Sequence, residues 1–270
     1  MSDSIASHAR MHPAEAPVPN PVAPRERIPP PRRSVGNELL DFLLQGGVPG
    51  GSLYLLLGPA YCGKEAVVAS FARAAACAGE PLVVVLTNMT PARFRADVAR
   101  LGGELARHEA TGRVAYVDCY ADAVGWGARD PFVVATPTAR DPAAMMDALL
   151  EAIEQADGEA RIVIDSISDL VLRGLDDHDG AAHLQRLTGV ARARGLTGLL
   201  TADAGIHAPS RLALLQHRAD GTIEFRERDD GRSFLRVRGG GGGATRDWVE
   251  YVASADGLDI VGSFTEQKVR

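Results

Sequence analysis

The fold is decided by the stretch Leu53-Tyr54-Leu55-Leu56-Leu57-Gly58-Pro59-Ala60-Tyr61-Cys62-Gly63-Lys64-Glu65, an apolar strand followed by a tight turn and the start of a helix. Backbone N–H groups of such a turn and of the helix N-terminus point at a bound anion, and the lysine adds a positive charge. The stretch matches the pattern G-x-x-x-x-G-K-S/T except at Glu65, which stands where a hydroxyl normally holds Mg²⁺. We therefore predict a nucleotide site whose phosphate loop consists of Gly58, Pro59, Ala60, Tyr61, Cys62, Gly63, Lys64 and Glu65.

The choice of basic residues singles out the same loop. Lys64 and Lys268 are the only lysines, whereas arginine is used at every other strongly basic position. A lysine ammonium presents a compact positive charge to a phosphate, which a planar guanidinium cannot replace. Chance alone can also place a lysine there. Cys62 lies beside this lysine and a helix N-terminus, conditions that lower a thiol pKa, so a redox switch and a small filler residue are both open readings.

The overall composition predicts a soluble protein with one sizeable core. The chain has 270 residues, 46% of them hydrophobic and 24% charged, and its net charge is −6. This acidic balance gives no global basic field to attract nucleic acid or anionic lipid, and no apolar run approaches the ~20 residues of a membrane helix. The three cysteines form no C-x-x-C pair, which argues against a disulfide framework or a zinc site. We expect a reduced, cytoplasmic protein for which nucleic acid is a poor partner and membrane insertion is excluded.

The sequence divides into one domain and two tails. Residues 1–33 are rich in proline, alanine and small polar residues, and bury too little apolar surface to offset the entropy cost of ordering. They are expected to form a disordered, Pro-rich tail, which is either a solvated leader or a docking segment. Residues 34–262 are expected to form a single nucleotide-binding domain, and residues 263–270 a C-terminal tail.

Helix and strand patterns alternate through most of this domain. Helices are expected at 37–44, 64–78, 92–101, 142–156 and 180–194, and apolar strands at 52–57, 81–87, 113–117, 161–165 and 197–201. Residues 120–141 are expected to be an irregular connection. From residue 221 onward, short strands at 222–225, 234–238, 248–252 and 258–261 alternate with turns. The predicted fold class is α/β, with a mostly parallel central β-sheet flanked by helices and an antiparallel β extension at the C-terminal end.

A second candidate site residue, Asp165, ends the apolar strand 161–165. Ligands of open α/β sheets bind at the carboxyl ends of the strands, and a carboxylate there holds Mg²⁺ in many phosphate-binding ATPases. Alternatively, this aspartate caps the following turn through Ser166 and Ser168. Together with the phosphate loop, the metal role is the favoured one.

An ordered set of motifs from Ser34 to Ile260 resembles the RecA-like P-loop ATPases, and more closely their KaiC-like branch. The set comprises Gly36-x-x-x-Leu40-Asp41, Gly46-Gly47-x-Pro49-x-Gly51-Ser52, the phosphate loop, Ile164-Asp165-Ser166-Ile167, Arg194-Gly195, Ala219-Asp220-Gly221-Thr222-Ile223, Leu235-Arg236-Val237-Arg238-Gly239 and Ala255-Asp256-Gly257-Leu258. The resemblance implies the RecA-like fold and a site for ATP with Mg²⁺. It also implies a homo-oligomer, ring or filament, with ATP at each subunit interface.

In such an assembly, the resemblance implies that Arg236 and Arg238 reach the γ-phosphate bound to the neighbouring subunit. The alternative is an edge strand whose arginines simply face solvent. The resemblance also places Thr201 and Asp203 where RecA-like proteins keep a polar γ-phosphate sensor.

Two departures from the family pattern concern hydrolysis. Glu65 replaces the hydroxyl that holds Mg²⁺, and Asn88-Met89 stand where the family carries paired glutamates, one of which activates the attacking water. Asn88 is able to orient a water molecule but not to accept its proton, and Met89 does neither. Both changes predict a degenerate site in which hydrolysis is slow or absent.

Three functions are therefore weighed. The leading one is an ATP-binding regulatory or scaffold protein, whose conformation or assembly is set by nucleotide and which acts on an unknown protein partner. The second is an active ATPase in which Glu65 and Asn88 are tolerated substitutes. The third is a binder of single-stranded DNA that resembles the recombination mediators, which the acidic balance and the lack of basic–aromatic interleaving in the sequence disfavour.

Overall fold

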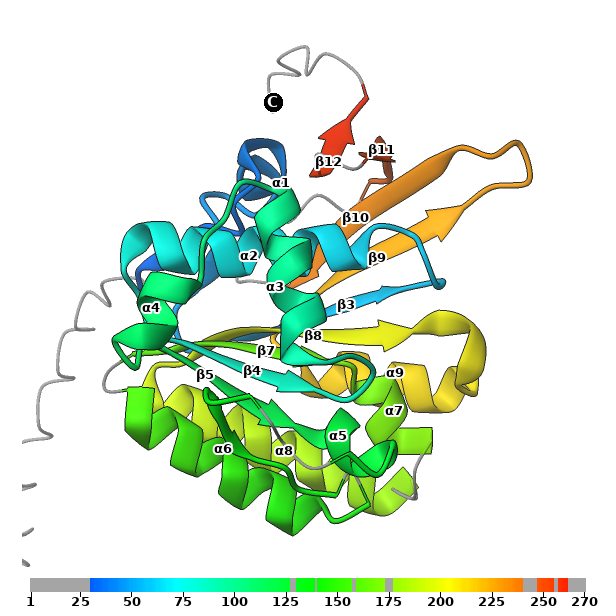
Figure 1. The fold of residues 1–270 in the computed structure, drawn as a ribbon. Coiled ribbons are helices and arrows are strands. Elements are labelled where there is room, and N and C mark those ends of the chain that lie inside the picture. Colours follow the sequence, from blue (N-terminus) through cyan, green and yellow to red (C-terminus); the bar gives the residue numbers. More distant parts are fainter. Residues whose placement is uncertain are drawn as a thin grey trace, which may run out of the picture.

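The computed structural model describes residues 30–126, 130–138, 140–156, 159–172, 177–239, 247–254 and 257–261. Residues 1–29 of the expected tail 1–33, and the whole expected tail 263–270, lie outside these residues and stay predictions. A large β-sheet with strand order β12-β11-β10-β9-β3-β8-β7-β4-β5-β6 runs through the molecule, and helices lie on both of its faces (Figure 1). The α/β class predicted from the sequence is confirmed.

The elements of the sheet alternate with helices over most of the chain. Its strands are β3 (Leu53–Gly58), β4 (Leu82–Leu86), β5 (Val114–Asp118), β6 (Val133–Ala135), β7 (Arg161–Asp165), β8 (Thr197–Asp203), β9 (Gly221–Glu227), β10 (Ser233–Gly239), β11 (Val249–Ser254) and β12 (Gly257–Ile260). The helices are α1 (Glu38–Leu43), α2 (Lys64–Ala78), α3 (Pro91–Arg100), α4 (Ala106–Ala110), α5 (Cys119–Ala123), α6 (Pro142–Ala156), α7 (Ile167–Leu172), α8 (Asp177–Arg194) and α9 (Pro209–Arg218).

Continuous apolar strands are explained by burial of both faces of the sheet. Tyr54 and Leu56 of β3 pack in one cluster with α1, α2 and α3, while Leu55 and Leu57 pack in the other with α6, α8 and α9. Because successive side chains of a strand point to opposite faces, such a strand must be apolar at every position. This is why the pattern at 53–57 has no polar alternation.

The sheet changes character at β9. From β9 through β3, β8, β7, β4 and β5 to β6, all neighbours are parallel, whereas β10 runs antiparallel to β9, β11 to β10 and β12 to β11. The expected antiparallel extension is thus confirmed. It continues the same sheet beyond β9, so β10, β11 and β12 are not a separate unit (Figure 1).

Arg32 and Arg33, which the sequence assigned to the N-terminal tail, pair with the domain. Arg32–Arg33 form β1, which pairs antiparallel with β2 (Val48–Pro49). Arg32 donates hydrogen bonds to the carbonyls of Leu44 and Gly47, and Arg33 pairs with Glu80 and Glu159. These two residues of the expected tail thus contact the domain, because they find acceptors that lie far away in sequence.

Other differences concern short elements. The expected irregular connection 120–141 contains α5 and β6, and three short helices, α4, α7 and α9, were not predicted. Asp118 caps α5 by accepting the backbone N–H of Ala121. Elements of three to six residues carry too few periods of a hydrophobic pattern to be recognised from the sequence. This reason does not cover α9, which has ten residues and was also not predicted. Among the described residues, no helix is both long and apolar enough to cross a membrane.

Helix α3, which borders the site described below, is fixed by Arg95. Its guanidinium pairs with Glu109 at 2.5 Å and Asp130 at 2.6 Å and lies over the rings of Tyr116 and Phe132. Glu109 is buried and also accepts the phenolic O–H of Tyr116. One arginine therefore joins α3 to α4, to β5 and to the connection before β6.

Replacing Arg95 by alanine should lower the free energy of unfolding by about 3 kcal/mol, because it leaves the buried Glu109 carboxylate without its cation. Urea unfolding of Arg95→Ala measures this. The matched control is Arg93→Ala on the same helix, whose side chain is mostly exposed and pairs with Asp97; it should cost less than about 0.5 kcal/mol. Equal losses for the two variants would contradict the role assigned to Arg95.

Candidate nucleotide site

The phosphate loop connects β3 to α2, as the sequence predicted. Gly63, at the N-cap of α2, has φ 94°, and a Cβ at this position would come within 3.0 Å of Ala253 on β11. At Gly58, a Cβ would lie 2.6 Å from that of Phe225 on β9. Glycine is therefore required at both ends of the loop, by backbone conformation at Gly63 and by close approach at both.

The far end of the chain supports this loop. Tyr251 of β11 donates its phenolic hydrogen to the carbonyl of Cys62, 189 residues earlier in the sequence. The Tyr251 ring also packs edge-on against Phe225, with 5.6 Å between ring centroids. Tyr61, at the apex of the loop, has φ 62° and is 93% exposed. The loop is thus anchored by the antiparallel extension, while its tip faces solvent.

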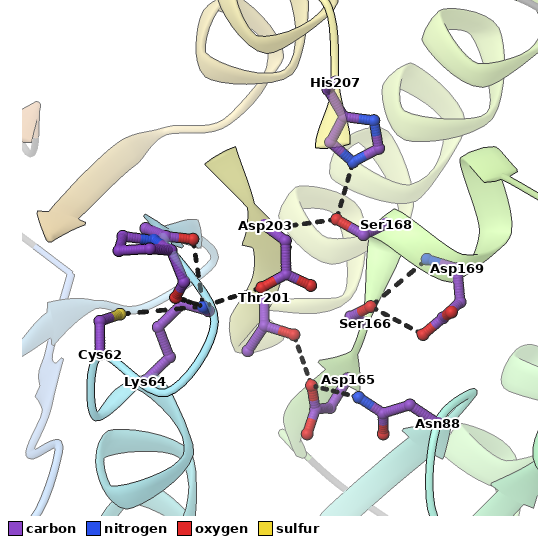
Figure 2. A network of polar contacts seen from close by, with 12 residues as sticks. Cys62, Lys64, Asn88, Asp165, Ser166, Ser168, Asp169, Thr201, Asp203 and His207 are labelled. Atoms are coloured by element: carbon purple, nitrogen blue, oxygen red, sulfur yellow. Dashed lines mark hydrogen bonds and ion pairs between the residues drawn. The ribbon is translucent and has the colours of Figure 1, made fainter. Parts of the chain in front are cut away.

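Lys64 is almost completely buried and already has acceptors. Its Nζ donates to the carbonyls of Gly58 at 3.2 Å and Pro59 at 2.5 Å, and pairs with Asp203 Oδ1 at 3.0 Å. Asp203 is brought there by the sheet, because Gly58 at the end of β3 and Asp203 at the end of β8 are paired in register. Figure 2 shows this cluster and the contacts that continue from Asp203 to Ser168 and His207.

Asp165 lies at the end of β7, on the same edge of the sheet. Its Oδ1 accepts hydrogen bonds from Thr201 at 2.5 Å and from Asn88 at 3.5 Å (Figure 2). Burial raises the pKa of the Asp165 carboxyl to about 6, partly offset by the Thr201 hydrogen bond. The alternative cap on Ser166 and Ser168 is not formed by Asp165: Asp169 accepts from Ser166, and Ser168 contacts Asp203 and His207.

A groove of about 610 Å³ lies against the outer side of the phosphate loop. It is bordered by Tyr61 and Glu65 of the loop, by Asn88, and by Arg93, Asp97 and Arg100 of α3. Asp97 pairs with both arginines, so the rim carries two guanidiniums held by one carboxylate. Lys64 and Asp165 do not border this groove, so it extends sideways from the phosphate loop rather than over its lysine.

The two arginines predicted to act on a neighbour are not equivalent. Arg236 donates to Glu224 through Nε at 2.9 Å and Nη2 at 2.5 Å and lies over the Trp248 ring, whereas Arg238 is half exposed and reaches Glu224 only at 3.5 Å. Glu224 is buried and also accepts from Gln216. Among the described residues, neither arginine forms a hydrogen bond or ion pair with residues 58–65 of its own chain.

Sequence reasoning missed a basic–aromatic face on the extension. Arg226 and Arg236 lie over the Trp248 ring, at 4.1 Å and 4.4 Å from its centroid, and Arg228 lies over Phe234 at 4.3 Å. Arg226 and Arg228 stand two residues apart at the end of β9, and Phe234 and Arg236 two apart on β10, so this spacing of two was the available signal in the sequence. Because the chain's own guanidiniums already stack on the rings, this face gives no free platform for DNA bases.

The surroundings of Cys62 argue against a redox switch. It is buried, and burial raises the pKa of its thiol to about 11, outweighing the lowering by Lys64. The small-filler reading is therefore the better one.

In native protein at pH 8, we expect 5,5′-dithiobis(2-nitrobenzoate) to react within minutes with the exposed Cys77, and with the buried Cys62 and Cys119 only after unfolding. Peptide mapping of the labelled protein assigns the reactive thiol, and Cys77→Ser is the control that should abolish the fast phase. A fast reaction at Cys62 would restore the redox reading.

Comparison with known proteins agrees with this geometry. A sequence model of the family described as "ATPase: KaiC" matches residues 34–238, well over half of the chain. The chain belongs to this KaiC ATPase family. The predicted RecA-like, KaiC-branch membership is thereby confirmed.

Curated relatives of this KaiC-type chain come from archaea. The UPF0273 protein MK0039 of Methanopyrus kandleri is 27% identical over 201 residues, 72% of this chain and 76% of that protein. The UPF0273 protein PAE3143 of Pyrobaculum aerophilum is 33% identical over 134 residues, 49% of this chain and 47% of that protein. The match to the latter therefore spans about half of its length.

A solved structure shares the fold. The crystal structure of the KaiC-like protein PH0186 from the hyperthermophilic archaeon Pyrococcus horikoshii OT3 superposes with a TM-score of 0.66 at 22% identity, covering 87% of this chain and 100% of that one. At this identity the likeness establishes the arrangement of sheet and helices alone.

Proposed function

We propose that this KaiC-type protein binds ATP as a regulatory ligand and hydrolyses it slowly or not at all. The observation that carries the proposal is the phosphate loop itself: Gly58 and Gly63 are sterically fixed, and Lys64 is directed at the carboxyl edge of the sheet beside Asp165. A helix N-terminus, a lysine and a strand-end carboxylate are the parts of a nucleotide triphosphate site.

The groove beside the loop provides the room for the nucleoside. Its volume, about 610 Å³, lies within the usual range of small-molecule sites, and it begins at Tyr61 and Glu65, next to the phosphates. Arg93, Asp97 and Arg100 supply hydrogen-bonding groups for ribose hydroxyls and base edges along its far wall. The phosphates would lie at the loop and the nucleoside between α2 and α3.

The residues near Asp165 fit Mg²⁺ in part. Mg²⁺ prefers oxygen ligands and keeps several waters, and Asp165 offers a carboxylate whose two hydrogen bonds both end on Oδ1. A cation here would favour the charged form of a carboxyl whose pKa burial otherwise raises. Glu65 would supply a second carboxylate from the first turn of α2. When bound, the ion would neutralise phosphate charge.

We propose weak hydrolysis because Asn88 and Met89 stand where a proton acceptor for the attacking water is expected. Asn88 donates towards Asp165 and carries no basic atom, and Met89 packs against the hydrophobic core. Neither is able to take a proton from an attacking water. Binding that sets conformation or assembly, without turnover, is what these substitutions favour.

Isothermal titration calorimetry with ATP and with ADP, each with and without Mg²⁺, tests the proposal. We expect micromolar binding, with ATP still intact in the cell at the end of the run, as checked by chromatography. Accumulation of ADP at rates typical of an ATPase would instead support the second candidate, an active enzyme. No heat and no thermal stabilisation with any nucleotide would overturn the proposal.

We further propose that ATP promotes assembly with a second copy of this chain, in which Arg238 meets the neighbour's phosphates. Arg238 is the freer of the two arginines, since Arg236 is committed to Glu224 and Trp248. Arg236 would then position the end of β10, and Arg238 would make the contact between subunits.

Arg238→Ala should weaken ATP-dependent assembly about tenfold in analytical ultracentrifugation and change the free energy of unfolding by less than about 0.5 kcal/mol. Arg236→Ala should instead destabilise the fold by about 1–3 kcal/mol, because the buried Glu224 then loses its paired donor. Assembly of Arg238→Ala that equals wild type would contradict this division of roles.

A further inference from the structure

The ammonium of Lys64 is already saturated in the ligand-free chain. A lysine has three N–H donors, and here three oxygen acceptors surround Nζ: Gly58 O, Pro59 O and Asp203 Oδ1, at 3.2, 2.5 and 3.0 Å. The Sγ of Cys62 is a weaker fourth acceptor at 3.8 Å (Figure 2). The side chain is only 3% exposed. A phosphate therefore reaches this lysine only by replacing one of these acceptors.

Asp203 is the acceptor that a phosphate replaces. The carbonyls of Gly58 and Pro59 belong to the backbone of the loop, whereas the Asp203 carboxylate comes from β8 and its side chain is one-third exposed. It is also the one anion of the three, so a phosphate and Asp203 on the same ammonium would repel each other. Exchange of one anion for another relieves that repulsion and keeps Lys64 paired.

Asp203 is linked to the segment that follows it. Its backbone N–H donates to Ser168 Oγ at 2.8 Å, and the same Oγ lies 2.7 Å from His207 Nε2. Ser168 and His207 are both buried. Residues 203–208 join β8 to α9 through the short 3₁₀ helix η1 (Ala204–Ile206), so a change at Asp203 acts directly on this connection (Figure 2).

We infer that Asp203 is an internal counter-ion of Lys64 that nucleotide phosphate displaces, and that its release loosens the β8–α9 connection, residues 203–208. The inference rests on the proposed nucleotide binding and names the regulation of that same site. It gives the protein a way to register occupancy without hydrolysis, because the signal is the exchange of anions and not the breaking of a bond.

A competing internal anion lowers the affinity for an external one. Removing the charge with Asp203→Asn should tighten binding of ADP, and of tripolyphosphate as a probe without a nucleoside, by roughly fivefold, as expected for loss of a partly exposed ion pair. The matched control is Asp230→Asn, which removes the same charge at the tip of the β9–β10 hairpin, where Asp230 pairs with Arg232. It should change both affinities by less than twofold.

This titration of the full-length chain distinguishes failure of the counter-ion inference from failure of the proposed nucleotide binding. If wild type binds ADP and Asp203→Asn binds it equally or more weakly, the counter-ion inference is overturned and the nucleotide site stands. If folded wild type and Asp203→Asn both bind neither ADP nor tripolyphosphate, the proposed function fails and takes the inference with it.

Hydrogen–deuterium exchange on wild type gives a test that needs no variant. Saturating ADP should slow exchange in residues 58–65 and speed it at least threefold in the peptide spanning residues 203–208, whose first amide is held by Ser168. Protection of the loop with unchanged or slower exchange in residues 203–208 would show that Asp203 stays in place.

Discussion

Lys64→Ala is expected to weaken ATP binding about a hundredfold, roughly 2.7 kcal/mol. Two effects add: the phosphates lose charge-assisted hydrogen bonds, each worth about 1.5–3 kcal/mol, and the Asp203 carboxylate, no longer neutralised by Lys64, repels them. Lys64→Arg should fail nearly as badly, because the buried space between the Gly58 and Pro59 carbonyls suits a compact ammonium and not a planar fork.

Calorimetry and the ATP-induced rise in melting temperature measure both variants. Arg232→Ala is the matched control, since it removes one positive charge at the distant hairpin, where Arg232 pairs with Asp230. It should bind ATP as wild type does. Retention of wild-type affinity by a folded Lys64→Ala protein would mean that the loop does not hold phosphate.

The double variant Glu65→Ser/Asn88→Glu is expected to raise Mg²⁺-dependent ATP hydrolysis by about a hundredfold or more. Serine would restore a compact hydroxyl for the ion, and glutamate would supply the missing proton acceptor, whose contribution is typically 10²- to 10⁴-fold. The new glutamate would stand near Asp165, because Asn88 already reaches that carboxylate at 3.5 Å, so the bound cation is needed to offset the repulsion.

Single variants separate the two contributions. Asn88→Glu alone should show the larger gain if proton transfer is limiting, and Glu65→Ser alone if Mg²⁺ placement is. Asn88→Gln is the matched control for Asn88→Glu, because it has the shape of glutamate but no carboxylate to accept a proton. High turnover by wild type, with little gain in the double variant, would show that Glu65 and Asn88 are working substitutes.

The parts of this fold that are set by short stretches of sequence could be predicted. The phosphate loop, the helix α2 that follows it and the buried strands were predicted within one or two residues, since each rests on a short pattern with a steric or hydrophobic cause. The antiparallel extension was also predicted, from turns rich in glycine and aspartate between short strands. The apolar run before it placed Asp165 at a strand end, and it became a candidate site residue because ligands bind at strand ends in such sheets.

The contacts that decide how the site works were not accessible, because they depend on register between distant strands. Lys64 and Asp203 are 139 residues apart and meet only because β3 and β8 are neighbours with Gly58 opposite Asp203. The ion pair between Glu224 and Arg236 follows in the same way, because these two positions are directly opposite each other on β9 and β10. A one-residue shift in either pairing would turn these side chains to the other face.

The hydrogen bond from Tyr251 to the Cys62 carbonyl has a practical consequence for where this chain tolerates being cut. A fragment that stops at the end of β9 keeps every residue of the phosphate loop and every parallel strand, yet leaves the loop without the side chain that braces it from behind. Shortened versions for crystallography or labelling should therefore retain β11. The exposed turn between β9 and β10, which touches neither the loop nor the groove, is the better place to insert a tag or a fluorophore.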